Sequence, residues 1–316
     1  MSTVLTVILN WRTPDLTLKA AETALASMEG VEGAVLIVDN DSGDGSEEQI
    51  RAGVAARGWQ RVHVLQAGHN GGFGAGNNAG MRAGLPGGLR PDYVYLLNSD
   101  AFPAPQTIPL LRDHLDQNPG LGMAGGYVAG PDGVAHQTLF RFPSIASELE
   151  GSAKTGPVTR LLKRHVVPLP IPDAPVTRAD WSAGCSLMMR QDMLDQIGLF
   201  DETFFLYFEE TDLCLRAAKA GWGLEYLRAA PVVHLGSEST GMGRWTRTPG
   251  YWFDSRWHYF SKHHGRLGAV LATLAHLTGG GIWRLRCALT GREIGDPPHF
   301  LKDLWRHMIS RKKRGI

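Results

Sequence analysis

Three carboxylates fall within four positions of the chain, at Glu209, Glu210 and Asp212. On a helix Glu209 and Asp212 share a face, and Glu210 lies about 100° away around the axis. Aromatic and apolar residues at 204–208 come directly before them, and burial beside such residues raises the pKa of a carboxylate. The pattern indicates a general base. The alternative is an acidic first turn that complements the helix dipole.

A second carboxylate that could take part in chemistry is Asp100, which follows an apolar run at 93–97. Such a run predicts a strand buried on both faces, and ligands of open α/β sheets collect outside the carboxyl ends of strands. Asp100 could therefore hold a divalent metal ion, or it could cap the next helix. His234 ends another short apolar run just before a glycine. It is either a metal or phosphate contact or a structural histidine.

Asp39 ends a third apolar run, 33–38, and opens a loop of turn-forming residues that reaches a helix start at Ser46. A connecting loop with its cap explains 42–46, but a carboxylate directly on the strand end is expected to meet ligand. The segment 69–80 is rich in glycine and asparagine, which allows close approach of the backbone to a partner. It formally contains a dinucleotide fingerprint, but that fingerprint normally follows the first strand, which here ends at Asn10 without a glycine.

The elements that must position these residues alternate between strand and helix, which predicts an α/β protein with a largely parallel sheet. Strands are expected at 4–9, 33–38, 62–65, 93–97, 121–128, in the later part of 180–190, and at 225–229 and 231–233. Helices are expected after 13, after 46, and at 106–117, 192–197 and 209–220. From 130 to 178 the pattern dissolves, and we expect a long variable connection.

Composition sets the broad class. With 43% hydrophobic and 20% charged residues the chain is globular, and its 316 residues allow one large domain with an appendage. Its three cysteines have no ligand-like spacing, which argues against disulfides or a zinc site and favours a reducing compartment. We expect no secretory signal, because a strand-like run follows Met1 directly, and no spanning helix at 267–283, because His276 and three glycines interrupt it.

The charge is divided unevenly. Residues 1–240 carry 18 Lys and Arg against 27 Asp and Glu, whereas residues 241–316 carry 14 against 4. We therefore expect a catalytic domain at 1–240 and a basic, aromatic-rich helical extension at 241–316. The stretches 249–263, 267–277 and 305–314 resemble amphipathic helices on an anionic membrane. The alternative is a helical appendage packed on the catalytic domain or on a second subunit; nucleic-acid binding is disfavoured because no recognition motif accompanies the charge.

Taken together, these motifs resemble the inverting glycosyltransferases of family 2, with the GT-A fold, and in particular the bacterial rhamnosyltransferase-like branch. The resemblance covers residues 4 to about 240. It depends on seven segments that occur in the same order as in the family, namely 38–46, 70–78, 97–100, 181–185, 200–202, 209–213 and His234.

The resemblance implies a Rossmann-like mixed sheet flanked by helices, and a role for each matching residue. Glu210 would be the base, where the family usually has Asp, with Glu209 and Asp212 as rival assignments. Asp100 would hold Mg²⁺ or Mn²⁺ with help from His234, although Asn98 and Ser99 depart from the usual D-x-D form. Asp39 would read the base of the nucleotide. The remaining donor-side residues would be Asn40, Asn70, Gly72, Phe73, Asn77, Asn98 and Ser99, and the acceptor-side residues Trp181, Gly184, Glu209 and Asp212.

The implied reaction transfers rhamnose or a similar sugar from a dTDP- or UDP-sugar to a glycan or lipid-linked acceptor, at the cytoplasmic face of a membrane. A homodimer is compatible with the sequence. Two other classes compete. A nicotinamide-dependent oxidoreductase would need a glycine fingerprint after Leu9, and a non-catalytic nucleotide-sugar-binding protein would lack the acidic cluster.

Overall fold

The computed structural model describes residues 2–171, 173–236 and 245–314, and the chain in it divides into two compact units. The first unit comprises 1–139, 170–205 and 209–241, and the second comprises 140–169, 206–208 and 242–316. The predicted domain boundary at residue 240 lies outside the described residues. The segment 140–169, which precedes that boundary, belongs to the second unit.

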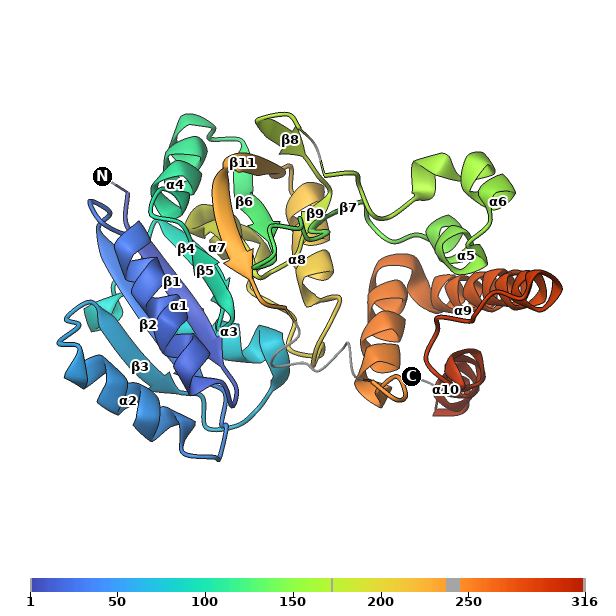
Figure 1. Cartoon of the computed structure of the whole chain (residues 1–316), viewed down its shortest axis with the longest axis horizontal. Coiled ribbons are helices and arrows are strands. Elements are labelled where there is room, and N and C mark those ends of the chain that lie inside the picture. The colour runs from blue at the N-terminus through green and yellow to red at the C-terminus, as the bar shows by residue number, and fades with distance from the viewer. Residues whose placement is uncertain (1, 172, 237–244, 315–316) are drawn as a thin grey trace. The chain divides into compact units, whose positions relative to one another are not determined.

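The first unit is built on one mixed sheet (Figure 1). Within the described residues its strand order is β3-β2-β1-β4-β10-β6-β11-β5, with β8 (Val176–Arg178) paired to β11. The four strands at one side run parallel, and they are β1 (Val4–Asn10), β2 (Gly33–Asp39), β3 (Val62–Gln66) and β4 (Tyr93–Asn98). These strands confirm the expected positions to within a residue or two.

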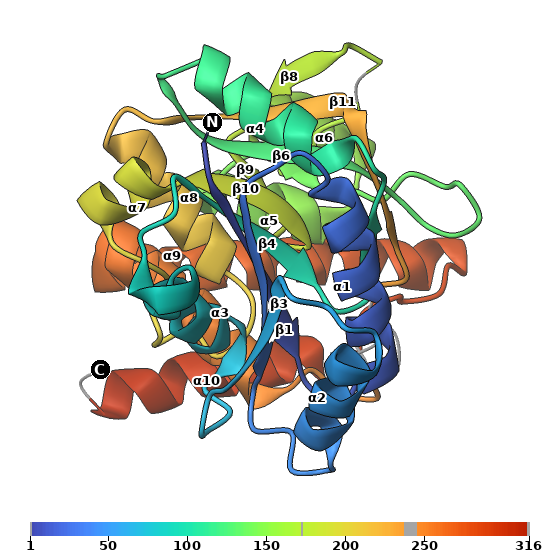
Figure 2. The ribbon, with the colours of Figure 1, turned by 90° about the vertical axis from the view of Figure 1, so that its left-hand side faces the viewer.

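Helices cover both faces of the sheet. On one side lie α1 (Pro14–Ser27) and α2 (Ser46–Ala56), and on the other lie α3 (Gly72–Ala83), α7 (Gln191–Ile197) and α8 (Glu209–Lys219) (Figure 2). Because both faces are covered, the strands are apolar along nearly their whole length rather than alternating. This explains why polar residues appear abruptly at the strand ends.

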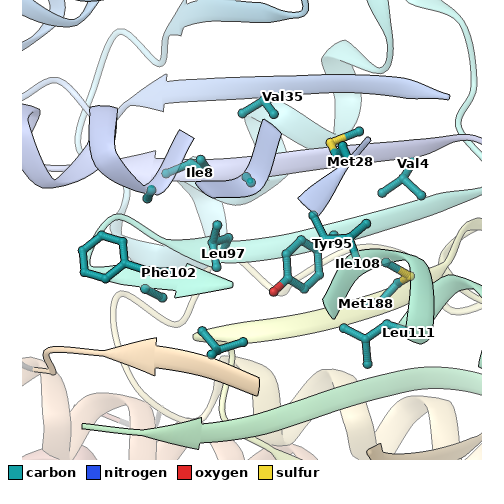
Figure 3. Close-up of a cluster of buried hydrophobic side chains, with 14 of the residues drawn as sticks. Val4, Ile8, Met28, Val35, Tyr95, Leu97, Phe102, Ile108, Leu111 and Met188 are labelled. Carbon is teal, nitrogen blue, oxygen red and sulfur yellow. The ribbon is translucent and has the colours of Figure 1, made fainter. Parts of the chain in front are cut away.

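The main core lies between the sheet and α1 together with α4 (Thr107–Gln117). Side chains from β1, β2 and β4 meet Met28, Ile108 and Leu111 in a single cluster (Figure 3). The strand residues that point into it are Val4, Ile8, Val35, Tyr95 and Leu97, all at most 2% exposed.

The glycine-rich stretch forms most of α3 instead of an open loop. A Cβ atom added to Gly76 would lie 2.4 Å from Leu9 Cδ1, and one added to Gly80 would lie 2.7 Å from Val7 Cγ1. These glycines therefore let the helix press closely against β1 and β2. Glycine is a poor helix former, and here tertiary packing overrides that preference.

Antiparallel strands extend the sheet beyond β4. β10 (Ser186–Arg190) pairs antiparallel with β4 and with β6 (Leu121–Ala129), and β6 pairs parallel with β11 (Gly223–His234). The short β5 (Ala101–Pro103) closes the edge against β11. The two strands expected at 225–233 are one strand whose register shifts before Pro231, a residue that cannot donate to the ladder.

The segment 130–178 is more ordered than its sequence indicates. It contains β7 (Leu139–Phe140), α5 (Ile145–Ala153), α6 (Gly156–Leu161), a 3-10 turn (Lys163–His165) and β8, and β7 pairs with β9 (Trp181–Ser182). α5 begins with a capping box between Ser144 and Ser147. Its packing partner is α9, more than 100 residues later, so local pattern reading misses it.

The second unit consists of α5 and α6 with α9 (Gly250–Thr290) and α10 (Phe300–Arg314). Arg256 of α9 is 2% exposed and donates to Glu148 Oε2 of α5 over 2.8 Å, while His276 Nδ1 lies 2.6 Å from the same oxygen. Burial would raise the pKa of Glu148, but Arg256 and His276 lower it to about 2. This buried ion cluster joins the two helices. In the part of the chain that the structure describes, no helix is long and apolar enough to span a bilayer.

Candidate active site

A row of polar side chains lies along the carboxyl ends of the four parallel strands. In strand register, Gln66 of β3 pairs with Asp39 of β2, Asp39 pairs with Asn10 of β1, and Asn98 of β4 lies beside Leu9 of β1. The order of the strands reverses around β1, and this is where open α/β sheets bind ligands. Thr13 Oγ1 donates to Ser99 Oγ over 2.9 Å and so links the loops that follow β1 and β4.

Asp39 is 1% exposed and receives four hydrogen bonds. Its Oδ1 accepts from Asn10 Nδ2 and from Ser42 Oγ, each over 2.6 Å, and its Oδ2 accepts from the Ser42 amide over 3.1 Å and from Gln66 Nε2 over 3.0 Å. Burial would raise the pKa of Asp39, but these donors lower it below its ordinary value. The carboxylate is therefore ionised and rigidly held, with its acceptor positions filled.

Asn40 and Asn70 connect the loops after β2 and β3. Asn40 Nδ2 donates to Asn70 Oδ1 over 3.0 Å, and Asn70 Oδ1 also accepts from the Gly72 amide over 3.0 Å. Asn40 Oδ1 is buried without a hydrogen-bond partner in the described parts of the chain. These two amides hold the start of α3 at the end of the sheet.

The loop before α8 presses on the start of α3. Gly72 has φ 89°, and a Cβ atom there would lie 1.8 Å from the carbonyl oxygen of Phe205, so this position accepts only glycine. The amide of Phe73 donates to the same oxygen over 2.9 Å. Asn77 lies inside α3, 1% exposed, and donates to the Phe73 carbonyl over 3.0 Å.

Asp100 and His234 come together from two different strands. Asp100 is 3% exposed; its Oδ1 lies 3.1 Å from His234 Nε2, and its Oδ2 accepts from the Gly236 amide over 3.1 Å. Burial would raise the pKa of Asp100, but His234 and the Gly236 amide lower it. Asn98 Nδ2 lies 3.5 Å from the same His234 nitrogen. The pairing of β5 with β11 aligns Ala101 with His234 and thereby brings the two side chains together.

The donor set of Asp100 and His234 fits a divalent ion. Adjacent ligands of an octahedral ion at about 2.1 Å are about 3.0 Å apart, close to the observed separation of the carboxylate oxygen and the imidazole nitrogen. Among the described residues no three His, Cys, Asp or Glu side chains gather into a metal site. Mg²⁺ and Mn²⁺ accept such a site, because waters and substrate phosphates commonly complete their coordination.

Glu210 lies at the start of α8 and faces Gly184. Its Oε1 accepts from the Gly184 amide over 3.3 Å, and a Cβ atom on Gly184 would lie 3.0 Å from Glu210 Cγ and 3.2 Å from the Phe73 ring. Burial raises the pKa of Glu210 above its ordinary value. Gly184 precedes β10, which starts where its antiparallel neighbour β4 ends. Glu210 is thus directed to the strand end that carries Asp100.

Cys185 lies near Asp100 and Glu210. Its carbonyl accepts from the Asn98 amide over 3.1 Å, and its thiol pKa is raised to about 12 by burial and then by the charges of Asp100 and Glu210. The thiol therefore lies within electrostatic range of both acids. It is buried and protonated, which excludes it as a nucleophile.

The other two acids of the cluster point elsewhere. Glu209 is 1% exposed, with its Cβ atom on the side of α8 that meets Gly74 of α3. Asp212 is fully buried and pairs with Arg216 over 2.8 Å, and Arg216 donates to the carbonyls of Ile197 and Leu199. Trp181 is half-buried on β9, three residues before Gly184. The geometry distinguishes Glu210 from its neighbours.

Three polar residues at this edge of the sheet were not among the site residues predicted from the sequence. Asn10 and Gln66 each follow an apolar strand run directly, so the rule that identified Asp39 would have found them. His136 comes from the hairpin after β6, and its ring lies edge-on to His234 with the centroids 5.7 Å apart. No local signal identifies His136, because its neighbour His234 is almost 100 residues away.

Comparisons with known proteins bear on the family and the fold. A family model described as "Glycosyl transferase family 2" matches residues 14–179. The chain is 30% identical, over 243 residues, to an N-acetylglucosaminyl-diphospho-decaprenol L-rhamnosyltransferase of Mycobacterium tuberculosis, a match that covers 72% of this chain and 74% of the relative. It is 38% identical over 58 residues to Rhamnosyltransferase WbbL of Escherichia coli, covering 18% of this chain and 22% of that protein.

Solved structures share the fold at low identity. The mannosyltransferase PcManGT from Pyrobaculum calidifontis, solved with GDP-Man and Mn²⁺, has a TM-score of 0.55 at 12% identity, covering 99% of this chain and 86% of that one. S. aureus TarS 1-349 has a TM-score of 0.53 at 12% identity, covering 98% and 82%. These likenesses confirm the predicted GT-A fold with a mixed sheet.

Proposed function

The chain belongs to glycosyl transferase family 2 and is a glycosyltransferase, and we propose that it transfers a sugar with inversion from a nucleoside diphosphate to a hydroxyl group. Family membership sets aside the nicotinamide oxidoreductase and the non-catalytic binding protein. The single observation that supports the proposed mechanism best is the position of Glu210. Its carboxylate, with a raised pKa, lies beside the strand end that presents Asp100.

In this mechanism Glu210 takes the proton of the acceptor hydroxyl as its oxygen attacks the anomeric carbon. The bond between that carbon and the phosphate oxygen breaks on the opposite side, and the nucleoside diphosphate leaves with the electron pair. The raised pKa of Glu210 suits this role, because a base gains driving force as its pKa approaches the working pH. The Gly184 amide orients the carboxylate.

On the leaving-group side, Asp100 and His234 would hold Mg²⁺ or Mn²⁺ against the diphosphate. A bound divalent ion acts there as a Lewis acid that stabilises the charge of the leaving group. The low pKa of Asp100 keeps its carboxylate ionised and ready for this contact. Asn98 and Ser99, beside it on the same strand end, would contact the sugar or phosphate.

The nucleoside would lie over the ends of β1, β2 and β3. Asp39 is our candidate for reading the base, but its four hydrogen bonds mean that a base N–H must replace one of the present donors. Gln66 is the donor that we expect the base N–H to displace, because Ser42 and Asn10 are buried whereas Gln66 is half-buried. Asn40, Asn70, Gly72, Phe73 and Asn77 would support this pocket from the start of α3.

For the substrates we propose a dTDP- or UDP-linked rhamnose or similar sugar and a lipid-linked saccharide, with Trp181 and Gly184 on the acceptor side. The support is the relative from M. tuberculosis, whose name specifies L-rhamnosyl transfer to N-acetylglucosaminyl-diphospho-decaprenol. A lipid anchor on the acceptor would hold the reaction at a membrane surface, and we propose the cytoplasmic face.

The experiment is a hydrolysis and transfer screen with purified protein against dTDP-, UDP- and GDP-sugars, with and without Mn²⁺. We expect release of one nucleoside diphosphate, stimulated by the ion. Addition of a short-chain polyprenyl diphosphate N-acetylglucosamine should convert hydrolysis into transfer, and the anomeric configuration of the product should be inverted. Retention of configuration, or full activity in excess EDTA, would contradict the mechanism.

A further inference from the structure

The second half of α9 exposes a continuous row of large apolar side chains. After Gly265, where φ is 71° and the helical backbone is interrupted, the helix continues to Thr290. We name the exposed large apolar residues of this helix segment the leucine stripe. They are Leu267 (71% exposed), Leu271 (43%), Leu274 (40%), Ile282 (38%), Leu285 (63%) and Leu289 (78%). Their spacing of three or four residues, or eight where exposed Thr278 intervenes, puts them on one face.

The opposite face of the same helix segment carries small residues, and this is the face that packs inside the second unit. A Cβ atom on Gly279 would lie 2.1 Å from Ser152 Oγ of α5, and one on Gly280 would lie 2.7 Å from Leu301 Cδ2 of α10. Ala269, Ala272 and Thr273 are fully buried on that side. The helix therefore directs its small residues inward and its leucines outward, which is the reverse of an ordinary surface helix.

A row of this kind in water indicates a binding surface, because contiguous exposed apolar patches are disfavoured on soluble proteins. From Leu267 to Leu289 the helix rises about 33 Å, so the stripe is long and narrow. The rest of the unit is strongly basic, with 19 Lys and Arg against 6 Asp and Glu, whereas the first unit has 13 against 25. Lys262, Arg266 and Arg292, near the ends of the stripe, are exposed.

The charge decides between the two kinds of partner that an apolar helix face could take. Two copies of the second unit that met through their stripes would bring two strongly positive surfaces together, which is repulsive. A bilayer with anionic headgroups offers acyl chains to the leucines and negative charge to the surrounding lysines and arginines. The combination therefore favours lipid over a second copy of the chain.

We propose that the leucine stripe is the surface through which this protein binds an anionic lipid bilayer, with Arg266–Thr290 lying in the plane of the interface. The inference deepens the proposed function, since it rests on the lipid-linked acceptor. Of the three stretches that the sequence put on the membrane, 249–263, 267–277 and 305–314, it keeps the second and extends it to residue 290. In the first of these stretches, Phe253, Trp257, Tyr259 and Phe260 are at most 5% exposed and form the interior of the unit.

The test is sedimentation of the full chain with vesicles of equal parts phosphatidylglycerol and phosphatidylcholine, and with vesicles of phosphatidylcholine alone. The variant is Leu267→Asn with Leu285→Asn and Leu289→Asn, the three most exposed positions of the stripe, which should leave the fold intact. The matched control is Leu89→Asn with Val134→Asn, which are 65% and 61% exposed in the first unit. Truncation of α10 is unsuitable, because Leu304 and Met308 are buried.

We expect the wild type and the control to bind anionic vesicles, and the triple variant to bind at least about tenfold more weakly. Added salt and removal of phosphatidylglycerol should both weaken wild-type binding, because they screen or remove the headgroup charge. Equal binding by the triple variant and the control would overturn the proposal. A dimer in light scattering that the triple variant dissociates would also overturn it, since the stripe would then join two copies.

Donor hydrolysis by the same proteins separates this inference from the proposed function. Because the stripe is distant in sequence from Asp100 and Glu210, the triple variant should hydrolyse donor at the wild-type rate. Loss of hydrolysis in every protein, the wild type included, would contradict the proposed function, while vesicle binding would still decide the role of the stripe.

Discussion

The amide of Gly184 donates a hydrogen bond to Glu210 Oε1 over 3.3 Å and joins the strand end beside Asp100 to the first turn of α8. The contact is close because Gly184 has no side chain, and a Cβ atom there would lie 3.0 Å from Glu210 Cγ. It distinguishes Glu210 from the two neighbouring acids. Glu209 packs toward α3, and Asp212 is paired with Arg216.

Glu210→Gln should lower kcat by about 10²–10⁴-fold, because it removes a general base while nearly keeping its shape. Donor affinity should change little, since the proposed donor contacts are made by other residues. Steady-state kinetics with saturating donor measure this. The matched controls are Glu209→Gln and Asp212→Asn, which should lower the melting temperature, and should lower kcat only as far as the fold is lost. The assignment of the base is wrong if Glu210→Gln keeps the wild-type kcat while either control loses kcat at an unchanged melting temperature.

The pH profile of transfer should show an acid limb with an apparent pKa above 4.5, the ordinary value for Glu, because burial raises the pKa of Glu210. Protonated Glu210 cannot accept the hydroxyl proton, so kcat/KM should fall as the pH drops through the raised pKa. Glu210→Asp should keep a limb but shift it. A profile that stays flat down to pH 4.5 would argue against Glu210 as the titrating base.

Asp100→Asn should abolish the Mn²⁺-dependent part of nucleoside diphosphate binding, because it replaces an ionised ligand by a neutral amide. His234→Ala should weaken that binding without abolishing it. Calorimetry with and without Mn²⁺ gives the readout independently of turnover, and Glu22→Gln on the exposed side of α1 is the control. Metal-enhanced binding that survives in Asp100→Asn would refute the assignment.

Asp39→Asn should destabilise the first unit and reduce nucleotide affinity together. Four donors form hydrogen bonds to the two oxygens of this carboxylate. The side-chain amide of asparagine keeps one oxygen to accept from them, but its NH2 group would face the donors that bonded to the other oxygen. Each buried donor left unpaired costs about 1–3 kcal/mol. Thermal unfolding and nucleotide titration measure the two effects. Asp41→Asn is the matched control, because Asp41 is exposed and its φ of 57° suits asparagine.

Acid should destabilise the second unit through Glu148. Its pKa is lowered from 4.5 to about 2 in the folded state, so its contribution is fully present above pH 4.5 and is lost as the pH falls toward 2. Glu148→Gln leaves Arg256 buried without its charge partner and should cost about 3–5 kcal/mol at pH 7. The difference in melting temperature between variant and wild type should shrink below pH 4.5. A constant difference would contradict the linkage.

Much of the fold follows from the sequence, and so do the strand ends that carry Asp39 and Asp100, because the signals there are local. An apolar run that stops at a polar residue marks the end of a buried strand, and this locates Asp39 and Asp100 without knowledge of any neighbour. The parallel arrangement follows from the alternation of strands and helices. The same rule, applied without exception, would have added Asn10 and Gln66.

Tertiary structure decided what depends on partners distant in the chain. The orientation of Glu210 is set by Gly184, and the contact of Asp100 with His234 is set by the pairing of β5 with β11. The glycine-rich stretch forms a helix because its glycines pack directly against Val7 and Leu9 of β1. Sequence periodicity shows that α9 has two faces, but packing against α5 and α10 determines that the small residues face inward and the leucines outward, because burial depends on contacts that no local pattern records.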